Sequence, residues 1–93
     1  MLTLKSTDMD DLILELRSKK VELAIETVTR VLEGLEQKTD RVELQINSAL
    51  EMSLFVPSQD YISSLKINFD RLEQAEEYEL CKEALKWITE ASV

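Results

Sequence analysis

The sequence predicts an all-α fold, either a small bundle or a set of helical hairpins, with three to four helices in one domain that spans residues 1–93. Apolar residues recur at three- and four-residue steps along most of the chain, as they do on the buried face of a helix. Capping or turn residues separate these stripes near residues 18, 34–40 and 55–58. With one Gly and one Pro, the chain has few places at which a helix would break.

The first helix is expected to begin where the Thr7 hydroxyl or the Asp8 carboxylate can accept hydrogen bonds from the free N–H groups of a first turn. The apolar stripe that follows slips in phase between Leu16 and Val21. One long bent helix or two helices broken near Ser18 would each produce this slip. We favour the long helix.

The residues after this first helical region allow two interpretations. Gly34 and the polar residues behind it are expected to end the region, because glycine commonly closes helices. Val42, Leu44 and Ile46 then alternate with polar residues as in a strand, whereas a longer set fits one helical face. That longer set consists of Val42, Ile46, Ala49, Leu50 and Leu54. We favour the helix, because a lone strand would have no obvious partner for its backbone groups.

Pro57 and Ser58 mark the clearest boundary. Pro57 disfavours a helical conformation at Val56, and Ser58 can cap the helix that we expect from about Gln59 onward. No Pro, Gly or capping hydroxyl lies beside Glu76, which favours one continuous helix through that point. A turn near Glu76 stays open as the alternative.

Composition excludes several classes of chemistry. The chain has no His, which removes histidine phosphotransfer, Ser-His and Cys-His nucleophilic catalysis, and most zinc sites. Nineteen acidic residues against eleven basic ones give a formal charge of -8, which opposes direct binding to nucleic acid. General acid catalysis by a carboxyl group needs a partly buried pocket, and nothing in the sequence indicates one. We therefore expect a protein without enzymatic activity, cofactor or metal.

Location and assembly follow from simpler features. Cys81 is the only cysteine, so the chain cannot form an internal disulfide, which favours a reducing compartment. No segment is apolar for long enough to span a bilayer. We expect a soluble cytoplasmic protein that does not bind membranes. Because a core of this size is thin, we also expect a homodimer.

The densest acidic stretch lies between residues 70 and 83. This acidic band consists of Asp70, Glu73, Glu76, Glu77, Glu79 and Glu83. Such a run commonly serves only as a solvated helix face. Carboxylates spaced along a helix can also present a row of negative charge to a basic partner surface, and they speed encounter at low salt. The acidic band is therefore the candidate partner-binding surface.

Trp87 joins the acidic band as a candidate partner-binding residue. It lies off the apolar stripe that contains Cys81, Leu85 and Ile88. Burial in the core is the commoner position for such a residue, but tryptophan is also enriched among interface anchors. A contact between Trp87 and a partner or a second subunit therefore stays open.

The apolar spacing between residues 69 and 88 resembles the short helical motif through which the repair proteins UvrB and UvrC associate. The positions concerned are Phe69, Leu72, Tyr78, Glu79, Leu80, Cys81 and Ile88. The resemblance covers less than a quarter of the chain, and Lys86 and Trp87 stand near the place of that motif's Arg-Asp pair. The resemblance implies association with another protein.

These features predict a small, non-enzymatic protein-interaction module, of the inhibitor or regulatory-adaptor kind, that engages a basic surface of its partner. A nucleic-acid-binding protein is one such partner, because its phosphate-binding surface is basic. The alternative is a structural, self-assembling helical protein whose charges only maintain solubility and which has no dedicated acidic docking site.

Overall fold

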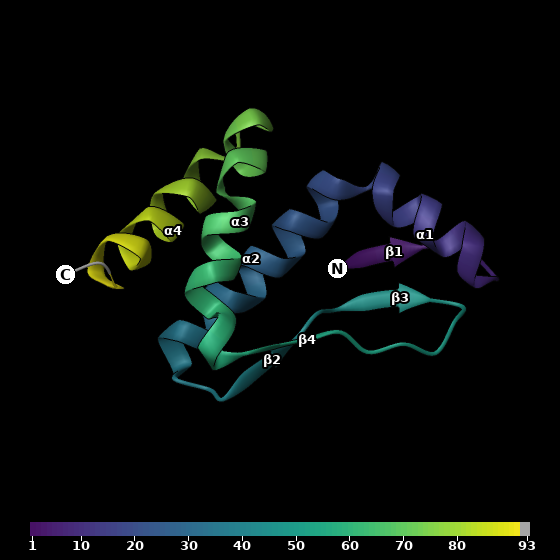
Figure 1. The fold of residues 1–93 in the computed structure, drawn as a ribbon, viewed down its shortest axis with the longest axis horizontal. Coiled ribbons are helices and arrows are strands. Elements are labelled where there is room, and N and C mark those ends of the chain that lie inside the picture. Colours follow the sequence, from purple (N-terminus) through teal and green to yellow (C-terminus); the bar gives the residue numbers. More distant parts are fainter. Residues whose placement is uncertain (92–93) are drawn as a thin grey trace.

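The computed structural model describes residues 1–91 and shows a mixed α/β chain. In chain order the elements are β1 (Leu2–Leu4), α1 (Met9–Ser18), α2 (Lys20–Gln37), β2 (Arg41–Glu43), β3 (Ile46–Ser48), β4 (Phe55–Pro57), the short 3-10 helix η1 (Ser58–Asp60), α3 (Tyr61–Gln74) and α4 (Tyr78–Ala91). The molecule is flat and elongated, with principal extents of 44 × 29 × 16 Å (Figure 1).

The strands form two small sheets. β1 pairs with β3 in parallel, with Leu2 opposite Ile46, and β2 pairs with β4 in antiparallel fashion, with Val42 opposite Val56. In Figure 1, β1 and β3 lie on the same side of α1. The all-α prediction is therefore wrong, and so is the helix favoured for residues 42–54.

The alternation of Val42, Leu44 and Ile46 with polar residues correctly indicates extended chain, whereas the helical stripe that we favoured does not form. These three side chains are buried or half-buried, while the polar residues between them are exposed. The backbone groups of this segment pair with β1 and β4, each of which is only three residues long and distant in the sequence. The pairing extends beyond the strands, since the Leu44 N–H donates to the Leu54 carbonyl oxygen at 2.9 Å.

Two apolar clusters share α2. The larger cluster joins α2, α3 and α4 and contains Ala24, Val28, Val31, Tyr61, Leu65, Leu72, Cys81 and Ala84. The smaller cluster joins β1 and α1 through Leu2, Leu4 and Leu12, with Leu23 of α2 packed against it. The helix α2, about 27 Å long at 1.5 Å per residue, therefore connects the helical end of the molecule to the end that carries the parallel sheet.

The break between α1 and α2 lies at Lys19, so the favoured single bent helix is wrong and the break near Ser18 is right. Asp8 caps α1 as predicted, accepting a hydrogen bond from the Asp11 N–H at 2.9 Å. Lys19 leaves the helical region of backbone angles, and its ammonium group donates to the Thr3 carbonyl oxygen at 2.7 Å. The break lets α1 turn back over β1 and bury Leu12 there.

The helix α2 ends within the predicted boundary at residues 34–40, but Gly34 is not the residue that closes it. The helix continues to Gln37, and it is Lys38 that adopts the left-handed conformation at its end, with a φ of 57°. A β-carbon at position 34 would lie 2.6 Å from Val42 Cγ1 and 2.7 Å from the Tyr61 hydroxyl oxygen. Gly34 is therefore required by the close approach of α2 to its neighbours rather than by a turn.

The chain between α3 and α4 turns at Glu76, so the continuous helix favoured by local propensity is wrong. Glu76 has a φ of 61°. The Glu77 N–H donates to the Leu72 carbonyl oxygen at 2.9 Å, and the Glu76 N–H donates to the Glu73 carbonyl oxygen at 3.0 Å. This pair of bonds is a Schellman motif, which closes α3 and sends α4 back along it as the second arm of a helical hairpin (Figure 1).

Candidate functional site

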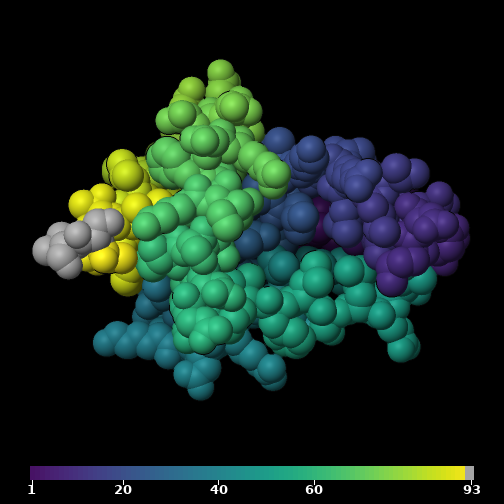
Figure 2. Space-filling view, viewed as in Figure 1, coloured from purple at the N-terminus to yellow at the C-terminus, as the bar shows by residue number. Residues whose placement is uncertain are grey.

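The structure brings the acidic band to the turn of the α3–α4 hairpin. Asp70 and Glu73 lie in the last turns of α3, Glu76 and Glu77 lie in the connection, and Glu79 and Glu83 lie in the first two turns of α4. The hairpin turn projects from the body at the top of the space-filling view (Figure 2). A band expected along one helix is thus folded around one protruding end of the molecule.

The carboxylates of the acidic band make no ion pair or side-chain hydrogen bond with any residue that the structure describes. All are exposed except the half-buried Glu77. Within residues 1–91, no ion pair or side-chain hydrogen bond involves any of them, although Arg71 and Lys82 lie in the same segment. Six acidic and two basic residues give residues 70–83 a net charge of -4, half of the charge of the whole chain. The acidic band therefore concentrates unneutralised charge at the hairpin turn.

Glu15 shows how differently the chain uses a structural carboxylate. Its oxygens accept hydrogen bonds from the Lys5 and Ser6 N–H groups at 2.9 Å and from the Ser6 hydroxyl at 2.6 Å. Lys19 adds an ion pair at 3.0 Å. The Ser6 hydroxyl and the Lys5 N–H have the largest effects and, with Lys19 and the Ser6 N–H, lower the Glu15 pKa to about 2, although burial acts in the opposite direction. Glu15 therefore fixes the connection between β1 and α1.

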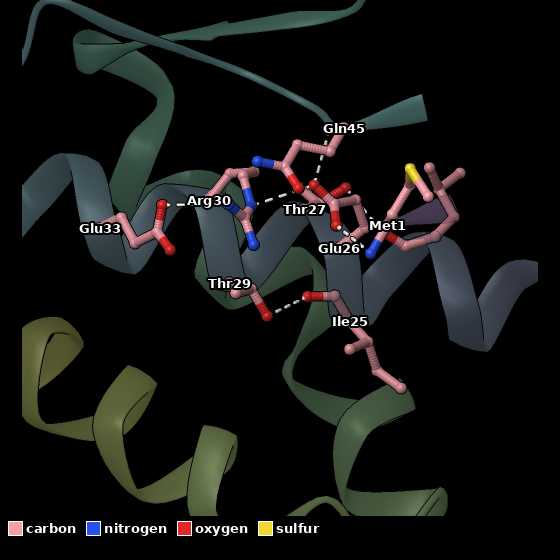
Figure 3. Close-up of polar contacts among 9 residues, drawn as sticks. Met1, Ile25, Glu26, Thr27, Thr29, Arg30, Glu33 and Gln45 are labelled. Atoms are coloured by element: carbon pink, nitrogen blue, oxygen red, sulfur yellow. Dashed lines mark hydrogen bonds and ion pairs between the residues drawn. The ribbon is translucent and has the colours of Figure 1, made fainter. Parts of the chain in front are cut away.

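Glu26 is the second structural carboxylate, and its side chain is only 4% exposed (Figure 3). One oxygen accepts a hydrogen bond from the Gln45 N–H at 2.8 Å and lies 3.0 Å from Arg30 Nε, while the other lies 3.3 Å from the Met1 amino group. The Arg30 N–H is not directed at the oxygen, so this contact is an ion pair rather than a hydrogen bond. Glu26 therefore links α2 to the chain between β2 and β3.

Cys81 lies on α4 between Glu79 and Glu83 of the acidic band, and its side chain is buried. Burial raises the pKa of the Cys81 thiol, and the negative charges of Glu73 and Glu77 raise it further. The thiol is therefore held in its neutral form, which is the less reactive one.

Trp87 lies on α4 four residues after Glu83, so these two side chains share one side of the helix at the edge of the acidic band. Trp87 lies in the second half of α4, half-buried against the larger apolar cluster. Eleven residues of chain separate it from Glu76 at the hairpin turn, whereas Glu83 lies only four residues away, about 6 Å at 1.5 Å per helical residue. A contact between Trp87 and a partner stays a prediction.

Catalytic and metal chemistry find little support in the geometry. Among the described residues, no group of three or more His, Cys, Asp or Glu side chains is placed to hold a metal ion. A polar hollow between α2 and β2 contains Glu33 and Glu43 together with Arg30 and Arg41. Both carboxylates are exposed, and Glu33 is hydrogen-bonded to Arg30 at 3.1 Å. The hollow therefore lacks the buried acid that general acid catalysis requires.

One surface feature was missed by the sequence interpretation. A groove between α3 and α4 is lined by Lys66, Phe69, Asp70, Leu85 and Ile88; we call it the α3–α4 groove. Leu85 is 51% exposed there. The heptad spacing of Tyr78 and Leu85 could have indicated an exposed stripe, but only if the break at Glu76 had been known.

A comparison of the chain with protein families, with curated proteins and with solved structures finds no match to any of them. The resemblance to the helical motif of UvrB and UvrC therefore rests on residue spacing alone. In the part of the chain that the structure describes, no helix combines the length and apolar character needed to cross a membrane.

Proposed function

We propose that this protein is a small, non-enzymatic interaction module, of the inhibitor or regulatory-adaptor kind, whose acidic band binds a basic surface of a partner protein. The proposal rests on the position of the six carboxylates of the acidic band and on their lack of ion pairs among residues 1–91. They lie at a protruding end of the molecule and, among residues 1–91, have no positive side chain within ion-pairing distance.

The backbone at Glu76 adds support. A residue other than Gly or Asn in the left-handed conformation costs roughly 1 kcal/mol, and glycine is the usual residue at this position of a Schellman motif. The chain instead places a carboxylate there, at the centre of the acidic band. Residues with a strained backbone conformation cluster at functional sites, where their role outweighs the loss of stability.

The electrostatics of the acidic band suit recognition more than stability. Unpaired surface carboxylates contribute nothing to folding through ion pairs, but they attract a basic surface over about one Debye length, roughly 8 Å at physiological salt. Such attraction raises association rates and falls as salt is added. A basic, nucleic-acid-binding protein is the class of partner that we propose.

The test compares two variants of equal charge. The first reverses Glu76, Glu79 and Glu83 to Lys. The second reverses three exposed acids outside the acidic band to Lys, namely Glu22, Glu36 and Glu51. Proteins that co-purify with the wild-type chain are quantified by mass spectrometry beside those of each variant.

The proposal predicts that the band variant loses the basic partner while the control variant keeps it. Equal loss in both variants would indicate a dependence on net charge alone, and unchanged capture by the band variant would exclude the acidic band as the docking surface.

Self-assembly is the second candidate function, and one observation favours it. The helix α1 leaves several apolar side chains exposed near its start and along its length, with Met9 at 65%, Ile13 at 46% and Leu14 at 62%. A homodimer or larger assembly that covers α1 would explain this exposure without any role for the acidic band. Light scattering separates the candidates, since a large stable oligomer without a co-purifying partner supports assembly.

A further inference from the structure

The α3–α4 groove is an apolar hollow with charged residues along its α3 side. Phe69, Leu85 and Ile88 supply its apolar surface. Lys66 lies toward the start of α3, and Asp70 lies one turn further on, where the groove meets the acidic band. Glu73 continues the same side of α3, since Lys66, Asp70 and Glu73 follow one another at four- and three-residue steps. The groove therefore has a basic end at Lys66 and an acidic end at Asp70 and Glu73.

The helix α1 presents the complementary pattern on its exposed flank. Met9, Ile13 and Arg17 follow one another at four-residue steps and so share one side of the helix. Met9 and Ile13 are 65% and 46% exposed, and Arg17 is exposed. Asp10 lies beside them at the start of α1. This flank is therefore apolar in the middle, acidic at its amino-terminal end and basic at its carboxyl-terminal end.

The spacing of the charges also agrees. Asp10 and Arg17 are seven residues apart on α1, and Lys66 and Glu73 are seven residues apart on α3, about 10 Å in each helix at 1.5 Å per residue. If α1 lies along the groove in the same direction as α3, Asp10 faces Lys66 and Arg17 faces Glu73. Met9 and Ile13 then lie over Phe69 and Leu85.

These two surfaces cannot meet within one molecule, because α1 and the α3–α4 hairpin lie at opposite ends of its long axis (Figure 1). We propose that α1 of one copy of this chain docks in the α3–α4 groove of a second copy. Two copies placed side by side in opposite directions make this contact twice, which closes a twofold dimer. Asp70 and Glu73 of the acidic band belong to this contact, whereas Glu76, Glu79 and Glu83, which are replaced in the test of the proposed function, lie outside it, so the two proposals can fail separately.

The test uses three variants of the full-length chain, each with one exposed apolar residue replaced by Asp. Ile13→Asp disrupts the docking helix, and Leu85→Asp disrupts the groove. Ile67→Asp is the matched control, because Ile67 is 71% exposed on α3 but does not line the groove. Sedimentation equilibrium gives the dimer dissociation constant of each variant, and circular dichroism checks that each is folded.

The wild type and Ile67→Asp should form dimers with similar dissociation constants. Ile13→Asp and Leu85→Asp should each raise the dissociation constant about a hundredfold, from about tenfold at each of the two contacts in the dimer. A monomeric wild type at all concentrations, or equal dissociation constants for all three variants, would overturn the proposal.

A charge exchange tests the direction of docking. Arg17→Glu should weaken the dimer by placing two carboxylates against each other, and adding Glu73→Arg in the same chain should restore it. If the double variant is as weak as Arg17→Glu alone, Arg17 does not face Glu73 and the proposed arrangement is wrong.

Discussion

The close packing at Gly34 gives the sharpest prediction about the fold. In Gly34→Ala, the new β-carbon would lie 2.6 Å from Val42 Cγ1 and 2.7 and 2.8 Å from the hydroxyl oxygen and Cζ of Tyr61. Tyr61 cannot move freely, because it is only 3% exposed and its hydroxyl donates to the Thr39 carbonyl oxygen at 3.0 Å. Accommodating the methyl group therefore requires α2 to move away from β2 and α3.

Two opposing effects set the change in the free energy of unfolding that Gly34→Ala causes. Overpacking a tight core position typically destabilises by about 1 to 3 kcal/mol. Replacing Gly by Ala inside a helix stabilises by about 1 kcal/mol. Because all three contacts are shorter than 3.0 Å and two of them involve the buried Tyr61, we place the packing penalty at the upper end. Gly34→Ala should therefore lower the free energy of unfolding by about 2 kcal/mol.

Urea denaturation followed by far-UV circular dichroism measures this change. A double-mutant cycle identifies its cause. Val42→Ala removes the closest contact, so it should relieve part of the destabilisation when combined with Gly34→Ala, with a coupling of at least about 0.5 kcal/mol. A Gly34→Ala protein as stable as the wild type, or one with no coupling to Val42→Ala, would refute the packing explanation.

Three further predictions concern single residues. Glu76→Gly should raise the free energy of unfolding by about 0.5 to 1 kcal/mol by relieving the left-handed strain, whereas the control Glu83→Gly, in the interior of α4, should lower it by about 1 kcal/mol; urea denaturation measures both, and a loss of stability in Glu76→Gly would contradict the assigned strain. Glu15 has its pKa lowered from 4.5 to about 2 in the folded state, so its stabilising contribution is present above about pH 4.5 and is lost as the pH falls toward 2. The stability difference between the wild type and Glu15→Gln should therefore shrink over that range, and a difference independent of pH would rule out this linkage. Cys81, whose pKa is raised by burial and by Glu73 and Glu77, should react with a disulfide reagent far more slowly in the folded protein than in urea; equal rates would show that the thiol is accessible.

Local signals in the sequence identified the start of α1 and the boundary before α3, but not the starts of α2 and α4 or the strands. Asp8 and Pro57 act through their immediate neighbours, so the cap of α1 and the boundary before α3 could be predicted. The strands β1, β2, β3 and β4 are only three residues long. Their pairing depends on contacts between distant segments, which the sequence does not show. For this reason the alternation at Val42, Leu44 and Ile46 does not outweigh the longer helical pattern in the sequence.

Two other errors have specific causes. Glycine commonly ends a helix, so the sequence predicts a terminus at Gly34. In the structure Gly34 lies inside α2, where the close tertiary contact with Tyr61 leaves no room for a side chain. Glu76 carries no local signal for a turn, since the residue that normally takes the left-handed conformation there is glycine. Both positions obey constraints that local propensity does not contain.

The candidate site was partly visible in the sequence. The six acidic residues and their density could be read directly, but their unpaired state and their gathering at the hairpin turn depend on the fold. Trp87 lies one turn beyond Glu83 on α4, and its part in partner binding stays a prediction. The α3–α4 groove could not be predicted, because it exists only once α4 folds back on α3.

The salt dependence of partner binding tests the proposed function most directly. The dissociation constant of the co-purifying partner is measured by titration calorimetry at several salt concentrations, with the wild type and with the variant that carries Lys at positions 76, 79 and 83. The wild type should bind tightly at low salt and weaken steeply as salt is added, and the variant should bind weakly with a much shallower dependence. Equal affinities and equal salt dependence for the two proteins would show that the acidic band does not bind the partner.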